Sequence, residues 1–213
     1  MRMKTACQKL GATLRTPLVV VALVAVTALV TRQVISDEKP GQSKAHEEMA
    51  AKWRAMNSPG PFHKNMDPMV GDWVAASKYS PAPGVPPEVN KGTCRNSWIM
   101  GGRFIKQEYR GKAMGEPFEG LGILGYDNMK KQYTSSWVDN MTTGIMADFG
   151  VCDESGKVFT FESTHPDPMT GKPVKMKSVT RVVNKDKHVF EMFREGPDGK
   201  MFKNLEITYT RKK

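Results

Sequence analysis

The sequence predicts an all-β domain in which antiparallel strands close into an up-and-down β-barrel. From Val70 onward, apolar and polar residues alternate with the period of two that is typical of β-strands. Clusters of Gly, Pro, Asn and Asp interrupt this alternation at short intervals, which predicts about eight to ten strands joined by hairpins. Because no second set of helices is expected, the strands must close on themselves or stack as a sandwich to protect their edges. Sequential hairpins favour the barrel.

Residues 1–32 have the pattern of a signal peptide or a membrane anchor. Residues 17–30 (PLVVVALVAVTALV) carry no charge and follow a basic segment, as an h-region follows an n-region. The uncharged stretch that ends before Arg32 is shorter than the roughly 20 residues of a typical membrane span, but no strong cleavage site follows it. Cleavage and anchoring both remain open, with the membrane as a partner if the segment is retained. Either outcome predicts the cell envelope, with the domain periplasmic or otherwise outside the cytoplasm.

Residues 33–44 are polar and contain Pro40 and Gly41, so we interpret them as a linker to a domain that spans residues 45–213. Residues 45–56 (AHEEMAAKWRAM) are rich in helix formers and place Met49, Trp53 and Met56 on one face. The stop signal SPGP follows at residues 58–61. This pattern predicts a short amphipathic helix that closes or packs against one end of the barrel.

Residues 201–210 show the clearest alternation of the predicted strands. One face of this strand consists of Met201, Lys203, Leu205, Ile207 and Tyr209. We expect that face to point into the barrel, because successive side chains of a strand lie on opposite sides of the sheet.

The net charge of +10 does not by itself indicate a nucleic-acid partner. Six Lys/Arg and two Asp/Glu fall within residues 1–40, and the remaining charges are spread along the predicted strands with acids interleaved. A nucleic-acid-binding domain would instead show a clustered basic patch with stacking aromatic residues. We therefore expect no nucleic-acid partner.

The three cysteines are too few for a disulfide scaffold. Cys7 lies in the targeting segment, so Cys94 and Cys152 are the pair that export would allow to be oxidised together. Two separate buried thiols are the alternative, and both interpretations remain open.

No catalytic or metal-binding motif is found in the sequence. The histidines lack the spacing of metal ligands, so we interpret them as surface residues and expect neither a metal nor another cofactor. They are His46, His63, His165 and His188. Residues 120–125 spell G-x-G-x-x-G, but a nucleotide fingerprint requires a helix next, and here another strand follows. We interpret these residues as a glycine-rich strand that lets its neighbours approach closely.

An open barrel would use a few polar or aromatic strand residues to orient a ligand in an otherwise apolar pocket. The candidates for this lining are Arg103, Glu108, Trp137, Asp139 and Arg181. Other strand carboxylates, among them Glu119 and Glu191, are interpreted as solvent-facing groups or as partners of arginines. The period of two shows which residues share a face, but it leaves open which face is the interior.

Several motifs resemble those of a bacterial family known as domain of unknown function 1579. They are residues 58–64 (SPGPFHK), 70–73 (VGDW), 100–104 (MGGRF), 107–109 (QEY), 117–120 (PFEG), 125–127 (GYD), 137–139 (WVD), 143–146 (TGIM), 167–172 (DPMTGK) and 196–200 (GPDGK). Together they cover roughly residues 45–211 in the expected order. The resemblance implies a β-barrel similar to lipocalin-type folds, without an assigned activity or established site residues.

Three functions are consistent with this sequence. The first is an envelope protein that binds a small, partly apolar molecule in the barrel, and fold together with the lack of catalytic motifs favours it. The second is an enzyme that uses strand carboxylates inside the barrel on a small molecule. The third is a membrane-tethered structural or interaction module, which would have a filled barrel and an apolar surface patch.

Overall fold

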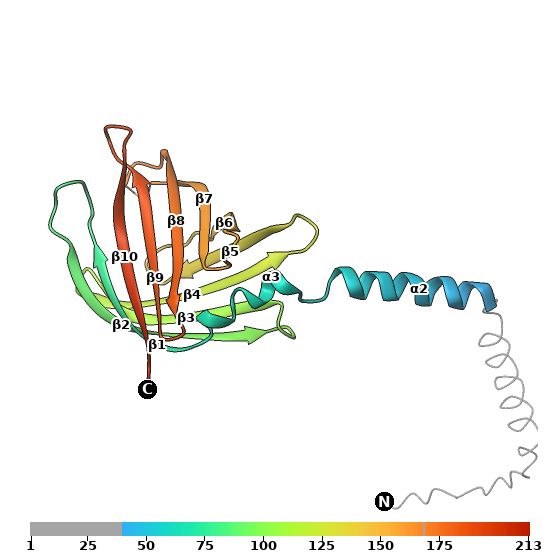
Figure 1. Ribbon diagram of the computed structural model, residues 1–213. Coiled ribbons are helices and arrows are strands. Elements are labelled where there is room, and N and C mark those ends of the chain that lie inside the picture. Colours follow the sequence, from blue (N-terminus) through green and yellow to red (C-terminus); the bar gives the residue numbers. More distant parts are fainter. Residues whose placement is uncertain (1–39, 168) are drawn as a thin grey trace, which may run out of the picture. The chain divides into compact units, whose positions relative to one another are not determined.

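The computed structural model describes residues 40–167 and 169–213, and it divides the chain into two compact units, Met1–Trp53 and Arg54–Lys213. The second unit contains a closed barrel of ten antiparallel strands (Figure 1). This result confirms the predicted barrel and excludes the sandwich. The predicted targeting segment and most of the predicted linker lie outside the described residues.

The helices and strands of the described chain are α2 (Pro40–Met56), α3 (Pro61–Lys64), the 3-10 helix η1 (Asp67–Met69), β1 (Gly71–Tyr79), β2 (Glu88–Ile99), β3 (Phe104–Ala113), β4 (Glu116–Asp127), β5 (Gln132–Asp139), β6 (Met146–Cys152), β7 (Val158–Pro166), β8 (Pro173–Asn184), β9 (Lys187–Glu195) and β10 (Met201–Arg211).

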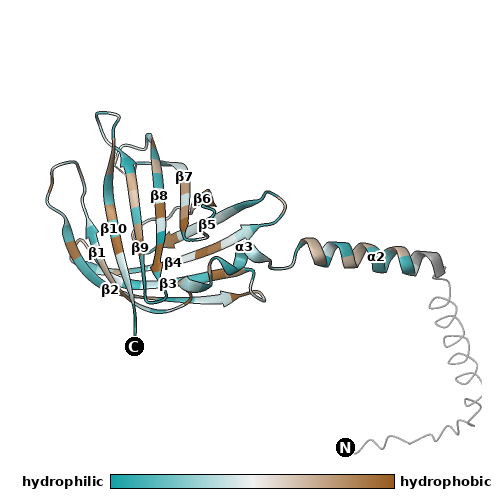
Figure 2. Cartoon of the chain, in the orientation of Figure 1, coloured by the Kyte–Doolittle hydropathy of each residue, from teal (hydrophilic) through white to brown (hydrophobic). Residues whose placement is uncertain are grey.

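Closure of the barrel depends on β1, which pairs with both β2 and β10. Trp73 lies opposite Cys94 on one side and opposite Arg211 on the other. Every other strand pairs with its neighbours in the sequence, as a series of hairpins requires. Apolar and polar residues alternate along the strands (Figure 2), so one face of each strand is buried inside the barrel.

Helix α2 begins at Pro40 rather than at the predicted Ala45, so the end of the predicted linker is helical. Proline is tolerated there because the first N–H groups of a helix have no intrahelical partner. The helix ends at Met56, as predicted. Of the helices that the structure describes, none is both long and apolar enough to cross a membrane.

A short segment that contains α3 and η1 closes one end of the barrel. Met66 and Met69 of this segment are fully buried in the core together with Ile105, Tyr133 and Phe159. The Met69 carbonyl accepts hydrogen bonds from Trp73 Nε1 at 2.9 Å and from Asn96 Nδ2 at 2.8 Å. We call this the closed end, and its closing contacts come from residues 61–70.

Arg211, at the end of β10, fastens this closing segment to the barrel. Its guanidinium donates to the carbonyl of Val70 at 2.9 Å and to that of Pro68 at 3.1 Å. The same group lies over the Trp73 ring, 4.2 Å from the centroid. Gly71 makes room for it, because a Cβ there would lie 2.2 Å from Arg211 Nη1. The end of β10 is thus bound to the segment that precedes β1.

The inward face of β10 differs from the prediction at its N-terminal half. Leu205, Ile207 and Tyr209 point inward as expected, but a β-bulge lies between Lys203 and Leu205. The bulge places Asn204 inside the barrel and leaves Lys203 outside, where it pairs with Glu191. An extra residue reverses the alternation of everything before it, so a strict period of two predicts the wrong face for the preceding half.

Replacement of Arg211 by methionine is expected to lower the free energy of unfolding by about 2 kcal/mol, since two partly buried carbonyls lose a charged donor and the cation–π contact is lost. Chemical denaturation measures this change. The matched control is Arg110→Met: Arg110 forms an exposed ion pair with Glu119 at 3.8 Å, so its loss should change the free energy by less than about 0.5 kcal/mol. Equal effects of the two substitutions would contradict the role of Arg211.

Candidate ligand-binding cavity

The barrel encloses a cavity of about 570 Å³. A barrel of ten strands is too wide for its inward side chains to meet across the middle, so an internal space results. The volume lies within the range of sites for small molecules.

Most of the cavity wall is apolar or aromatic. The apolar and aromatic side chains that line it are Met69, Tyr79, Tyr109, Ala113, Met114, Phe118, Leu124, Trp137, Met141, Met146, Phe159, Phe161, Met169, Met176, Phe190, Met192, Leu205, Ile207 and Tyr209. A wall of this composition favours an apolar ligand, because both surfaces leave water when they meet.

The cavity opens at the end opposite α3 and η1, which we call the open end. Met114, Met141, Thr142 and Met169 line the cavity and are also exposed, so they mark its mouth. At the other extreme, Met69 of the closing segment forms part of the floor. None of the four turns between strands at the closed end contributes a residue to the described lining.

Six methionines surround the outer half of the cavity. They are Met114, Met141, Met146, Met169, Met176 and Met192. The methionine side chain is unbranched and polarisable, and it adapts to apolar partners of different shapes. The mouth of the cavity can therefore adjust to its occupant.

Aromatic rings lie flat on the wall where the neighbouring strand has glycine. A Cβ on Gly120 would lie 2.0 Å from Trp137 Cζ2, and one on Gly122 would lie 3.1 Å from Trp137 Cε3. The Trp137 ring is nearly parallel to that of Phe118, with centroids 6.5 Å apart. These glycines belong to the G-x-G-x-x-G sequence, and its interpretation as a strand that allows close approach is confirmed. Rings that lie along the wall leave the middle of the barrel open.

His188 lies at the deep end of the cavity between two aromatic rings. Its ring stacks on Tyr209 with centroids 4.4 Å apart and meets the edge of Trp73 at 4.3 Å. Burial lowers the pKa of His188 from 6.5 to about 4, and the positive charge of Arg211 acts in the same direction. The neutral imidazole keeps one polar atom, Nδ1, buried and without a hydrogen-bond partner.

Asn204 contains a second buried polar atom that has no hydrogen-bond partner. It occupies the bulge of β10, is only 4% exposed and lines the cavity, and its Oδ1 has no hydrogen-bond partner. A buried polar atom without a partner costs folding free energy. His188 lies opposite Tyr209, so the two residues are roughly 15 Å apart along the strand direction, given the rise of a strand.

The wall formed by β5 to β8 carries several polar side chains. Asp148 Oδ1 and His165 Nε2 are 2.7 Å apart, and both residues line the cavity. Ser135 lies directly opposite Asp148, and Ser163 belongs to the same lining. A carboxylate that holds one nitrogen of a histidine orients the ring, so that the other nitrogen can exchange a hydrogen bond or a proton with a ligand.

Two of the five residues predicted to line the cavity do so. Trp137 and Asp139 are both in the lining, and Trp137 Nε1 donates to Asp139 Oδ2 at 3.0 Å. Asp139 also accepts the backbone N–H groups of Met141 and Thr142, each at 3.0 Å. This carboxylate therefore orients the tryptophan and shapes the β5–β6 turn at the mouth.

The other three predicted residues lie away from the cavity. Arg103 is in the β2–β3 turn, where it donates to the Met100 carbonyl. Glu108 is exposed and pairs with Lys106 at 3.0 Å, and Arg181 pairs on the outer surface with Glu191 at 3.4 Å. The predicted pairing of strand carboxylates with arginines is confirmed for this last pair.

The histidine prediction needs correction. His63 and His188 are buried and His165 lines the cavity, so these three are not surface residues. Cys94 and Cys152 are both free, which is the alternative of two separate thiols. Burial raises the pKa of Cys94 to about 12, so this thiol stays protonated and packs as a small apolar group. In the described part of the chain, no group of His, Cys, Asp and Glu residues is arranged to hold a metal ion.

The fold and the cavity define an antiparallel β-barrel with a mostly apolar interior that opens at one end. Residues 58–211 match the family described as Protein of unknown function (DUF1579), and the chain belongs to this family. The resemblance noted in the sequence is thereby confirmed. No curated protein matches the chain.

Solved structures share the fold at low sequence identity. The crystal structure of Rv2717c from M. tuberculosis has a TM-score of 0.55 and 15% identity, and the similarity covers 73% of this chain and 100% of that one. A redesigned β-barrel, b11L5F_LGL, has a TM-score of 0.38 at 13% identity and covers 70% and 96% of the two chains. EF1p2_mFAP2b bound to DFHBI has a TM-score of 0.40 at 12% identity and covers 71% and 99%. The similarity to Rv2717c supports the barrel fold alone, and the other two structures add nothing to it.

The buried His188 predicts a loss of stability in acid. Between pH 6.5 and about 4 the unfolded chain binds a proton at this position that the folded chain does not, so the free energy of unfolding falls as the pH is lowered through this window. The full effect is about 3 kcal/mol. Denaturation curves from pH 7 to pH 4 should show a shallower decline for His188→Phe than for the unchanged protein. Identical declines would show that His188 titrates normally in the folded state.

Proposed function

We propose that this protein binds a small, largely apolar molecule inside its barrel. The observation that carries this proposal is the cavity of about 570 Å³ with its apolar wall and open mouth. A domain with no need for a ligand would gain stability by filling this space, because packed interiors have few voids larger than a water molecule.

The polar groups of the cavity narrow the class of ligand. Asp148 and His165 form a polar pair on one side of the cavity, and most of the wall is apolar. A ligand that carries a hydrogen-bonding group can contact this pair while the apolar wall covers the rest of its surface. The predicted ligand is therefore a largely apolar molecule with at least one hydrogen-bonding group.

Binding is tested with the neutral fluorophore N-phenylnaphthylamine and a matched pair of variants on β5. Ser135 lines the cavity, whereas its neighbour Ser136 lies on the opposite face of the strand. Ser135→Trp should place an indole in the cavity and weaken probe binding by about tenfold or more, equivalent to about 1.4 kcal/mol. Ser136→Trp should leave the affinity unchanged.

A fluorescence titration measures both affinities. The proposal is wrong if the unchanged protein does not bind the probe, or if the two substitutions weaken binding equally. Circular dichroism of each variant serves as the control for correct folding.

We also propose that the protein works in the cell envelope, outside the cytoplasm. The support comes from the sequence: an uncharged apolar run at residues 17–30 follows several basic residues. Alkaline phosphatase, which becomes active only after export, fused behind residues 1–44 should be active in bacteria. Leu23→Arg places a charge in the apolar run and should abolish this activity. An inactive fusion with the unchanged segment would contradict the location.

A further inference from the structure

The connections between strands at the open end form a surface that surrounds the mouth of the cavity. We call this surface the open rim, and it consists of residues 80–87, 114–115, 140–145, 167–172 and 196–200. Large apolar side chains are exposed in four of these five connections, and Met201 is exposed directly after the fifth. They are Val85, Met114, Met141, Ile145 and Met169. Ile145 is 73% exposed and Met169 is 90% exposed.

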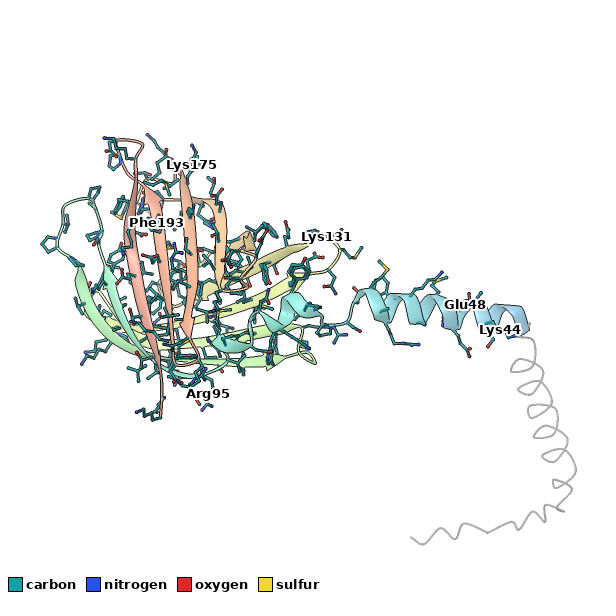
Figure 3. All side chains as sticks on the ribbon, in the orientation of Figure 1. Lys44, Glu48, Arg95, Lys131, Lys175 and Phe193 are labelled. Atoms are coloured by element: carbon teal, nitrogen blue, oxygen red, sulfur yellow. The ribbon has the colours of Figure 1, made fainter. Side chains whose placement is uncertain are left out.

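The open rim carries four charged residues, Asp167, Lys172, Asp198 and Lys200, which lie on two of its five connections. The connections at residues 80–87, 114–115 and 140–145 contain no Asp, Glu, Lys or Arg. At the closed end, by contrast, every turn between strands carries charge: residues 100–103, 128–131, 153–157 and 185–186 each contain Lys or Arg. Lys131, labelled in Figure 3, belongs to one of these charged turns. The two ends of the barrel therefore differ in polarity.

A protein partner that adds a strand is a poor match for this end of the barrel. Each strand is hydrogen-bonded on both sides, so the closed barrel has no free edge to pair with. The exposed apolar residues instead sit on separate connections around an opening. Apolar side chains on loop tips that bear few charges suit insertion into the surface of a lipid bilayer.

We infer that the open rim is a membrane-docking surface through which a lipid-like ligand passes between a phospholipid bilayer and the cavity. The inference rests on the proposed binding function and specifies where the ligand comes from. A largely apolar molecule dissolves poorly in water, and a mouth held against the bilayer lets it move without crossing water. The adaptable methionines Met114, Met141 and Met169 belong both to the rim and to the cavity lining, so they provide a continuous apolar path.

The test measures transfer of N-phenylnaphthylamine from the loaded full-length protein to phosphatidylcholine vesicles. The rim variant combines Val85→Asp with Ile145→Asp, two exposed residues that are not in the cavity lining. The control variant combines Met100→Asp with Met129→Asp, two methionines that are similarly exposed in turns at the closed end. The N-terminal segment is common to all three proteins, so differences in transfer report on the barrel.

Transfer from the unchanged protein should accelerate in proportion to vesicle concentration, and the rim variant should transfer the probe at least tenfold more slowly. The control variant should behave like the unchanged protein. Added salt should change the transfer rate little, because salt acts by screening charges and phosphatidylcholine carries no net charge. Equilibrium affinity for the probe, measured without vesicles, should be the same for all three proteins.

Two failures are distinguishable. If the unchanged protein has no affinity for the probe, the proposed function fails and the inference fails with it. If all three proteins bind the probe but transfer it at equal rates, or at rates independent of vesicle concentration, only the docking surface is ruled out.

Discussion

The hydrogen bonding of β1 to β10 is the constraint on which the rest of this structure depends. Ten strands in one closed ring have a circumference that their inward side chains cannot fill, so closure at this number creates the cavity. Closure also removes every free strand edge. The same pairing brings Arg211 beside the segment before β1, where its guanidinium fastens the floor of the cavity. This one strand pair therefore closes the ring around the cavity and leaves the barrel without a free edge. It also brings together the contacts that fasten the closed end.

Glycine and aromatic residues together control how much of this interior stays open. Trp137 lies over Gly120 and Gly122, and Phe161 lies so close to Gly150 that a Cβ there would be 2.7 Å from its ring. A ring over glycine covers backbone that would otherwise be exposed and projects little into the lumen. Large side chains can therefore stabilise the wall without filling the space.

The sequence contained enough information to predict the barrel, because alternation and hairpin turns recur along the whole of the β-domain. The sequence contained less information about which residues line the cavity. On β8, Thr180 points inward and Arg181 outward, yet both faces of this strand carry polar residues, so the pattern does not identify the interior. On β5 the aromatic Trp137 and the nearby Asp139 share a face, and this pair was predicted correctly.

The inward position of Asn204 depends on a bulge, and the burial of His188 depends on Trp73 from a distant strand. Neither contact has a signal in local sequence.

The contacts of Arg211 have a consequence for the order in which the barrel can be completed. Arg211 belongs to the last strand, β10, whereas its partners Pro68 and Val70 precede the first strand. Hairpins from β1 onward can form in sequence, but β1 keeps an unpaired edge, and the closing segment lacks its bonds to Arg211, until β10 pairs with β1. Contacts so distant in sequence form slowly, because a long loop must close before they are made. The barrel therefore folds through an open sheet with exposed strand edges, and this open form is the one most prone to aggregation.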